Sequence, residues 1–383
     1  MTITELQQLY AAHPNVEGMI RLLKDSSVRH LYCNGLCASS ASLFASTIVQ
    51  QAECPFVFVL GDLEEAGYFY HDLVQILGSD DVLFFPSSFR RAIKYGQKEA
   101  ANEILRSEVL SRLEKDGKHV CVVTYPDALA EKVVSRKELD DKTLKLHVGE
   151  KVDMDFVREV LRNYGFEYVD YVYEPGQYAV RGSIIDVFSF SSEYPFRIDF
   201  FGDEVESIRT FEVETQLSKE KKENIVIVPD LSHNLEDGGN GGMVSLLDFL
   251  QADTVLAMRD FLWLRERIQN VHDESLTPQA IAAREAEENG AIRLDGKLID
   301  GGEFTVRALD FRRMEFGNKP TGTPNAVLNF STSAQPIFHK NFDLVAQSFK
   351  EYIANGYTIY ICSDSTKQTD RIRAIFEDRG DNI

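Results

Sequence analysis

Residues 174–216 read EPGQYAVRGSIIDVFSFSSEYPFRIDFFGDEVESIRTFEVETQ, a dense succession of short alternating strands punctuated by glycine. In the stretch PFRIDFF the even positions are all apolar: Phe196, Ile198 and Phe200. The odd positions carry two charges and an aromatic ring: Arg197, Asp199 and Phe201. Side chains of a strand alternate between two faces, so the pattern predicts a core face of even residues and an opposite face of odd residues.

Phe201 is a large aromatic side chain that the alternation places beside charges on the solvent side. An arginine next to an exposed aromatic ring is typical of the anchors of protein interfaces. In one register, the preceding strand pairs through a turn at Ser191–Pro195 and paired positions have an even sum. Arg181 then lies opposite about Asp203. It shares one face with Arg197 and Phe201, whereas a slip by one residue would move it to the other face.

A structural interpretation competes with this partner-binding hypothesis. Both arginines would then pair with neighbouring carboxylates, and Phe201 would be covered by another element. The neighbouring carboxylates are Asp199, Asp203 and Glu204. The alternation of residue types is compatible with both interpretations.

Outward from this segment, residues 1–127 alternate β-rich runs with amphipathic stretches. The predicted strands are His30–Cys33, Pro55–Leu60, Val82–Phe85 and His119–Thr124. The predicted crossover helices are Ser40–Gln51, Leu63–Leu77 and Gln97–Leu113. Strands that alternate with helices of this length predict a parallel α/β sheet covered by helices on both faces.

The chain is expected to have three parts. Residues 1–127 are the first part of the α/β domain, residues 128–217 are an inserted antiparallel α+β domain, and residues 218–383 are the remainder of the α/β module. The inserted domain is expected to begin its regular structure with a helix at Asp153–Tyr164, followed by hairpins.

The last part begins with two polar tracts that are expected to be exposed connections, SKEKKEN at 218–224 and GGNGG at 238–242. The elements expected around and after them are strands at Ile225–Val228, Thr254–Met258 and Tyr357–Cys362, a helix from Val244 and a helix from Lys367. The chain ends at DRGDNI without a closing cap, and we expect it to be part of a longer protein.

The loop NGLCASSAS, Asn34–Ser42, follows the first predicted strand, where a nucleotide-binding α/β domain carries GxxxxGK[ST]. Gly35 stands at the first glycine position and Ser42 at the hydroxyl position. Ser40 replaces the second glycine, however, and Ala41 replaces the lysine that reaches the terminal phosphates. We therefore expect no tight binding of ATP. The same residues fit an ordinary strand-to-helix turn equally well.

No other catalytic constellation stands out. An ATPase would need an acidic pair at the end of an apolar strand to hold Mg²⁺, but the predicted strand Thr254–Met258 is followed by Arg259 and Asp260. The eight histidines are dispersed, and the five cysteines form no pattern of zinc ligands. We expect reduced thiols, no metal site and no catalysis.

The charge and the apolar content of the chain indicate which kinds of partner it can bind. The 383 residues contain 41 Lys and Arg against 61 Asp and Glu, a formal net charge of −20. This charge repels a polyanion and argues against broad DNA binding by a basic surface. No apolar run approaches the roughly 18 to 20 residues that span a bilayer, and the N-terminus has no signal pattern. We expect a cytoplasmic protein without a membrane partner.

The run YAVRGSIIDVFSF followed by PFRIDFFGDEVESIRTFEVETQLS closely resembles the module shared by the bacterial excision-repair protein UvrB and the transcription-repair coupling factor Mfd. The resemblance is gap-free over this stretch. It extends, through NFDLVAQSFKEYIANGYTIYICSDSTKQTDRIRAIFED near the end, over nearly the whole chain. UvrB keeps an intact phosphate loop, so Ser40 and Ala41 indicate the coupling factor, whose N-terminal module is a degenerate copy of UvrB.

The resemblance implies a degenerate RecA-like (P-loop-type) α/β domain, interrupted by an α+β domain that docks the damage-recognition protein UvrA. In the family, an arginine of the VRG motif, an arginine at the start of RIDFF and its second phenylalanine contact UvrA. These match Arg181, Arg197 and Phe201. UvrB has a further arginine two positions before the VRG arginine, where this chain has Ala179, so contacts specific to UvrB are not carried over.

The implied function is that of an adaptor, which binds UvrA and recruits nucleotide excision repair to stalled RNA polymerase. The family's RNA polymerase-binding domain and its ATP-dependent DNA translocase motor would lie beyond Ile383. RNA polymerase, DNA, ATP and Mg²⁺ are therefore expected to bind there, and this chain is expected to need no cofactor and to have no enzymatic activity. The alternative is a UvrB-like DNA-dependent ATPase that verifies damage, against which Ser40 and Ala41 count.

Overall fold

A computed structural model describes residues 2–78, 81–88, 100–115, 120–141, 143–229, 243–275, 277, 296–339, 341–361, 363 and 365–381. The chain divides into two compact units, a first unit of residues 1–332 and a second unit of residues 333–383, and each is described by itself. In the part of the chain that the structure describes, no helix has the length and apolar character needed to cross a membrane.

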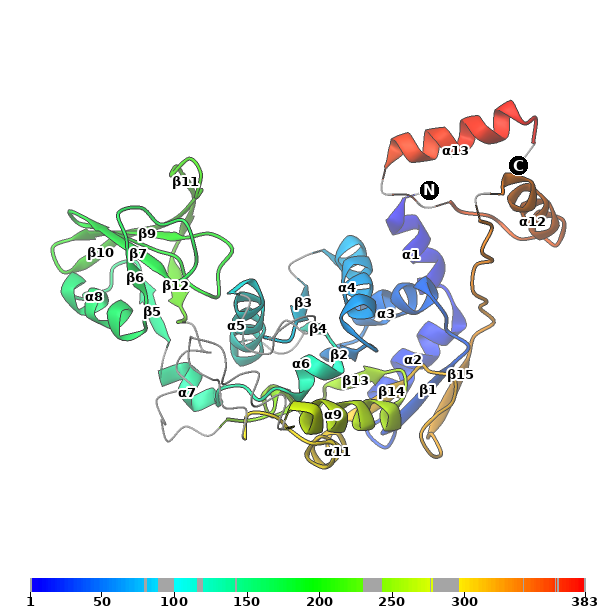
Figure 1. The fold of residues 1–383 in the computed structure, drawn as a ribbon, viewed down its shortest axis with the longest axis horizontal. Coiled ribbons are helices and arrows are strands. Elements are labelled where there is room, and N and C mark those ends of the chain that lie inside the picture. The colour runs from blue at the N-terminus through cyan, green and yellow to red at the C-terminus, as the bar shows by residue number, and fades with distance from the viewer. Residues whose placement is uncertain are drawn as a thin grey trace. The chain divides into compact units, whose positions relative to one another are not determined.

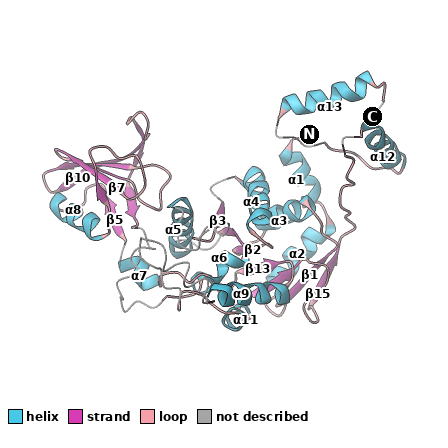
Figure 2. Ribbon diagram, viewed as in Figure 1, coloured by secondary structure: helices cyan, strands magenta, loops and turns pink. Residues whose placement is uncertain are grey.

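The first unit contains a seven-stranded parallel sheet in the order β15-β1-β14-β13-β2-β4-β3 (Figure 1). Its strands are β1 His30–Asn34, β2 Phe56–Val59, β3 Val82–Phe85, β4 Cys121–Thr124, β13 Val255–Met258, β14 Arg312–Glu315 and β15 Ala326–Asn329. Helices cover both faces of this sheet, as Figure 2 shows. The strands predicted in the first third and at Thr254–Met258 are confirmed, because their apolar runs are buried on both faces.

The helices of this layer come from both sides of the insertion. Before it lie α1 Ile3–Ala11, α2 Pro14–Lys24, α3 Ser39–Gln51, α4 Leu63–Leu77, α5 Ala100–Lys115, α6 Pro126–Ala130 and α7 Arg136–Asp141. After it lie the 3₁₀ helix η3 Leu246–Phe249, α9 Phe261–Ser275 and α11 Gly301–Ala308. The predicted crossover helices are thus confirmed in their described parts, whereas the helix predicted from Val244 is a single 3₁₀ turn.

The inserted domain is built on a six-stranded sheet in the order β11-β10-β9-β8-β7-β6. Its strands are β6 Glu167–Tyr168, β7 Gln177–Arg181, β8 Ile184–Val187, β9 Phe196–Phe201, β10 Glu204–Phe211 and β11 Ser218–Lys222. All neighbours are antiparallel except β6 and β7. A two-stranded ribbon of β5 Leu144–His147 and β12 Asn224–Ile227 and the helix α8 Met154–Asn163 complete the domain. The predicted insertion of an antiparallel α+β domain into a parallel α/β sheet is confirmed.

One face of the inserted sheet packs into the hydrophobic core of the inserted domain. The even residues of β9 are all buried in it: Phe196, Ile198 and Phe200. The amphipathic helix α8 packs Val157 and Leu161 into the same cluster. The core face predicted from the alternation is therefore confirmed.

The limits of the inserted domain differ from the expected 128–217. Residues 128–139 pack with the core of the parallel sheet, where Leu129 and Leu139 are fully buried. Ile225 and Ile227 of β12, in contrast, belong to the core of the inserted domain. The inserted elements thus run from β5 to β12, and the strand predicted at Ile225–Val228 pairs with β5 rather than joining the parallel sheet.

The charged tract 218–224 was expected to be a connection, but most of it forms β11, which pairs with β10. Lysine and glutamate on an edge strand protect it against pairing with other chains, so a charged run is compatible with a strand at this place. The predicted GGNGG connection at 238–242 lies outside the described residues.

Two strands beside β1 were not predicted. β14 has the sequence RRME, whose arginines mask the apolar signal of a buried strand. Arg312 donates to the carbonyl oxygens of Val28, Leu23 and Asp25 at 2.7 to 3.0 Å, which satisfies its guanidinium at the end of the sheet. Such a role follows from tertiary contacts and leaves no periodic pattern in the sequence.

The second unit consists of α12 Phe342–Ala354 and α13 Thr366–Asp378. Phe376 is buried against Phe342 and Phe349, with ring centroids 6.1 and 6.0 Å apart. The helix predicted from Lys367 is confirmed by α13. The strand predicted at Tyr357–Cys362 is absent at residues 357–361, where no partner strand is present among the described residues of this unit, and Cys362 lies outside them.

Candidate functional site

Arg181, Arg197 and Phe201 share one face of the inserted sheet, but not through the predicted register. The preceding segment forms two strands, β7 and β8, and Arg181 pairs with Ile184 across their tight turn. Ile184 in turn pairs with Asp199 of β9, so Arg181 does not lie opposite Asp203. Residues that pair across neighbouring strands lie on the same face of the sheet. Arg181, Ile184 and Asp199 therefore share one face, which is the face of the odd residues of β9.

The carboxylate of Asp186 on β8 is the centre of this face. Arg197 donates from Nε to Asp186 Oδ1 at 2.7 Å and from Nη2 to Oδ2 at 2.8 Å. Arg181 forms a second ion pair with Oδ2. Asp186 is fully buried, so two guanidinium groups compensate one desolvated carboxylate. The hydrogen bond to Asp186 raises the pKa of Arg197.

Arg197 is further held by its surroundings. Its Cζ lies 4.5 Å from the centroid of the Phe211 ring, and its Nη1 donates to the carbonyl oxygen of Gln216 at 3.1 Å. Only 16% of its side chain is exposed, against 36% for Arg181. Arg197 therefore stabilises the sheet, whereas Arg181 keeps more of its surface available to a partner.

Phe201 is 77% exposed, so no described element covers it. It ends β9 and pairs with Glu204 across a two-residue turn. Gly202 in this turn has φ 62°, a backbone conformation that glycine adopts without strain. The structural interpretation thus holds for the pairing of both arginines, although with Asp186 instead of the three named carboxylates, and fails for Phe201.

Asp186, the shared counter-ion of the face, was not predicted from the sequence. A signal was present, because the aspartate interrupts the apolar run IIDVF. A carboxylate within an otherwise buried strand needs cationic partners, and the nearest ones in a hairpin are arginines on the neighbouring strands.

The loop between β1 and α3 lies where a phosphate loop would lie, but its polar groups form hydrogen bonds within the protein. The backbone N–H of Cys37 donates to Ser40 Oγ at 2.9 Å and to Thr332 Oγ1 at 3.2 Å. Gly35 has φ 87°, and a Cβ added there would lie 2.2 Å from the carbonyl oxygen of Phe330. The segment at Phe330 and Thr332 therefore packs directly against this loop.

The residues at the expected lysine and hydroxyl positions are also engaged. Ser42 is buried and donates from Oγ to Asp72 Oδ2 at 2.6 Å, so its hydroxyl faces α4. Ala41 packs against the core of the sheet. Neither side chain can supply the lysine charge or the free hydroxyl of an active phosphate loop.

The residues after β13 have structural partners as well. Arg259 forms an ion pair with Glu65. Asp260 accepts a hydrogen bond from the backbone N–H of Trp263 at 2.9 Å, and it thereby caps the start of α9. Arg259 and Asp260 stand where an ATPase would carry an acidic pair. Only Asp260 is a carboxylate, and it caps α9.

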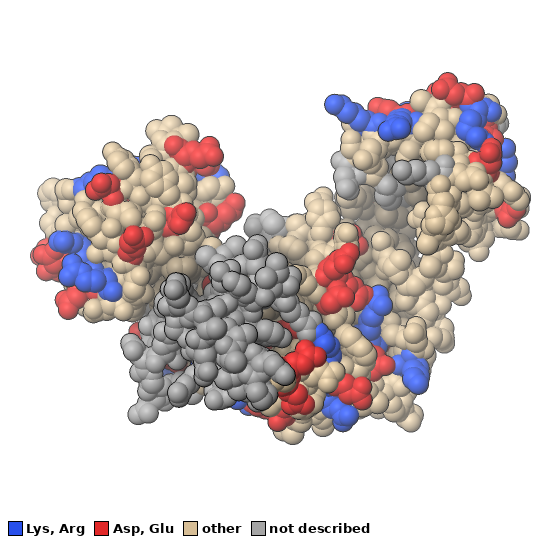
Figure 3. Space-filling model, in the orientation of Figure 1, with Lys and Arg blue, Asp and Glu red and all other residues tan. Residues whose placement is uncertain are grey.

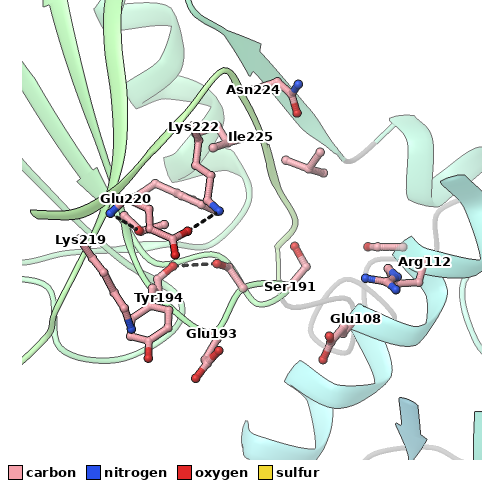
Figure 4. Close-up of a pocket in the computed structure, with 15 residues that line it drawn as sticks. Glu108, Arg112, Ser191, Glu193, Tyr194, Lys219, Glu220, Lys222, Asn224 and Ile225 are labelled. Carbon is pink, nitrogen blue, oxygen red and sulfur yellow. Dashed lines mark hydrogen bonds and ion pairs between the residues drawn. The ribbon is translucent and has the colours of Figure 1, made fainter. Parts of the chain in front are cut away.

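A cavity of about 630 Å³ lies away from the Asp186 cluster and is lined by α5, the segment 191–194, β11 and β12 (Figure 4). Lys219 Nζ lies 3.7 Å from the centroid of the Tyr194 ring, and Lys222 Nζ lies 2.8 Å from Glu220 Oε2. Because these cations have partners within the protein, the cavity offers no strong anion site.

Charge on the surface is mixed. On the face seen in Figure 3, the described Lys and Arg side chains are interspersed with Asp and Glu and form no continuous basic stripe. The described residues on this face therefore lack the continuous basic stripe that binds a nucleic-acid duplex.

Part of the chain matches a known protein family. Residues 144–233 match the family described as the UvrB interaction domain, and this range agrees with the insertion from β5 to β12. The transcription-repair-coupling factor of Bacillus subtilis is 21% identical over 404 residues, which cover 90% of this chain and 34% of the relative.

Two further relatives carry the same name. The transcription-repair-coupling factor of Haemophilus influenzae is 30% identical over 212 residues, 55% of this chain and 18% of the relative. That of Escherichia coli is 28% identical over 193 residues, 50% of this chain and 16% of the relative. The chain thus matches between 16 and 34% of the length of these relatives. The match to the UvrB interaction domain and the alignment over 90% of the chain support a UvrB-like module similar to that of the transcription-repair-coupling factors.

Proposed function

We propose that this chain is an adaptor that binds UvrA through the face of the inserted sheet that carries Arg181, Arg197 and Phe201. By this binding it recruits nucleotide excision repair to stalled RNA polymerase. The observation that carries the proposal is the presence of an exposed aromatic anchor beside a fixed arginine pair, in the domain that matches the UvrB interaction family.

The geometry of the face suits protein recognition. Phe201 offers an exposed ring at a turn, which can enter an apolar pocket on a partner, and such aromatic residues dominate interface energies. The arginines are held by Asp186 before a partner arrives, so their side chains lose little further entropy on binding. A partner needs to supply an apolar pocket and a group that accepts hydrogen bonds from Arg181.

We also infer that this chain neither hydrolyses ATP nor binds it tightly. The inference is supported by the internal hydrogen bonds of Cys37, Ser40 and Ser42 and by the absence of a lysine at Ala41. In the full-length protein, ATP and Mg²⁺ would bind to a motor outside this chain. RNA polymerase and DNA would likewise be contacted by other parts of that protein.

A titration of the chain with purified UvrA tests the adaptor proposal. We expect saturable binding that UvrB competes for, because both proteins would present the same type of domain to UvrA. A chain that shows no binding at micromolar UvrA would contradict the adaptor proposal. Measured ATP turnover that is abolished by changes within Asn34–Ser42 would favour the UvrB-like ATPase instead.

A further inference from the structure

We propose that Tyr171 is a second aromatic anchor of the face that carries Arg181 and Phe201, and that it contacts UvrA directly. The inference rests on the proposed binding of UvrA and extends the binding surface beyond the strands. Tyr171 lies in the segment between β6 and β7, and 53% of it is exposed. Exposed tyrosines are favoured in interfaces because they supply a large rigid surface and a polar end.

Tyr171 is joined to the proposed binding face through Arg181. The Arg181 Cζ lies 4.9 Å from the centroid of the Tyr171 ring, within the range of a cation–π contact. Arg181 Nη1 also donates to the carbonyl oxygen of Asp170 at 3.2 Å, and its Nη2 pairs with Asp186. The guanidinium is thus held by the ring, a carbonyl and a carboxylate. Because a guanidinium has five N–H donors, Arg181 keeps donors for a carboxylate of the partner.

The distance between Arg181, which the Tyr171 ring contacts, and Phe201 suits one partner. Arg181 is level with Asp199 across β8, and Phe201 is two residues further along β9. With strands about 4.8 Å apart and a rise of about 3.3 Å per residue, the Cα atoms of Arg181 and Phe201 lie about 12 Å apart. An ordinary interface buries about 800 Å² on each side and covers such a span. Arg181, with the Tyr171 ring against it, and Phe201 therefore fit within a single footprint.

The chemistry expected of the partner follows from these groups. The hydroxyl of Tyr171 makes no hydrogen bond to another residue that the structure describes. UvrA is expected to present an acceptor to this hydroxyl, a carboxylate to Arg181 and an apolar pocket to Phe201. The acceptor for the Tyr171 hydroxyl is a requirement on UvrA that the arginines and Phe201 alone would not set.

The matched control for Tyr171 is Phe156. This side chain is 52% exposed on α8, whose Val157 and Leu161 pack on the opposite face of the sheet. UvrA is titrated against the unmutated chain, Tyr171→Ala and Phe156→Ala, each checked by thermal melting. We expect Tyr171→Ala to weaken binding about 10-fold, and Phe156→Ala to bind as the unmutated chain does. Equal affinity of Tyr171→Ala and the unmutated chain would overturn the inference.

A second comparison separates direct contact from positioning of Arg181. Tyr171→Ala is combined with Arg181→Ala, which removes the guanidinium that the ring holds. Direct contact predicts a further loss of at least about fivefold relative to Arg181→Ala alone. An unchanged affinity would show that Tyr171 acts only through Arg181 and would overturn the inference. An unmutated chain that fails to bind UvrA would instead remove the proposed function itself.

Discussion

Arg181 and Arg197 donate to the same carboxylate, that of Asp186, although they lie on strands that are not neighbours in the sheet. The strand β8 between them supplies the shared anion. The two arginines are therefore one electrostatic unit, and replacing either one alters the environment of the other. For this reason Phe201, which takes no part in this unit, is the cleaner residue on which to test binding.

Loss of the shared anion is expected to destabilise the inserted domain. In Asp186→Asn the two guanidinium groups lose their counter-ion in a largely buried place, and we expect the free energy of unfolding to fall by about 3 kcal/mol. Asp203→Asn, at an exposed turn, is the matched control and is expected to change it by less than about 0.5 kcal/mol. Urea unfolding of both variants measures the difference. Equal stability of the two would show that the shared ion pair contributes little to folding.

The two faces of β9 are expected to respond differently to truncation. Ile198→Ala leaves a cavity in the core of the inserted domain and is expected to lower the free energy of unfolding by about 3 kcal/mol. Phe201→Ala removes an exposed ring and is expected to leave the melting temperature nearly unchanged. Thermal melts of both variants make the comparison. An early melt of Phe201→Ala would mean that its ring is covered in solution.

Restoring the missing lysine is not expected to restore nucleotide binding. In Ala41→Lys the backbone N–H of Cys37 still donates to Ser40 and Thr332, and the Ser42 hydroxyl still faces Asp72. Isothermal titration with ATP and Mg²⁺ is expected to show no tight binding for this variant or for the unmutated chain. Micromolar affinity in Ala41→Lys would show that the lysine charge alone was missing.

Stability is expected to fall at mildly acidic pH because of His30. Its ring is buried on β1, with Nε2 3.2 Å from Glu315 Oε1, and burial lowers its pKa below the usual 6.5. The unfolded chain then binds a proton that the folded chain does not, so stabilisation by neutral His30 is complete above about pH 6.5 and is lost as pH falls toward the folded pKa.

The measurement for His30 is the melting temperature at pH 7.5 and pH 5.5, in the unmutated chain and in His30→Gln. The substitution is expected to reduce the drop between the two pH values. A drop of the same size in both proteins would assign the pH dependence to other groups.

The sequence predicts the parts of this fold whose periodicity is set by burial. The even residues of β9 and the apolar strands β2, β3 and β4 are examples, because a face turned to the core must be apolar. The strand β14 and the strand β11 were missed because their charged side chains find partners or solvent at the end or edge of a sheet. Such partners are set by tertiary contacts that no local pattern contains.

The candidate site shows the same division. The alternation placed Phe201 correctly on the exposed face, and the assumed register and the family resemblance both added Arg181 to that face. The register that joined them was wrong, since the turn at Gly182 divides the predicted strand into β7 and β8. Asp186 and Tyr171 came from the structure, because their roles depend on side chains that meet across strands and loops.

The affinity of UvrA for Phe201→Ala, measured beside the unmutated chain by titration, tests most directly whether this face is the binding site. Phe201 is 77% exposed and takes no part in the Asp186 cluster, so its loss separates binding from folding. We predict an affinity weaker by about 2 kcal/mol, roughly 30-fold, with an unchanged melting temperature. A Phe201→Ala chain that melts normally and binds UvrA as tightly as the unmutated chain would contradict the account.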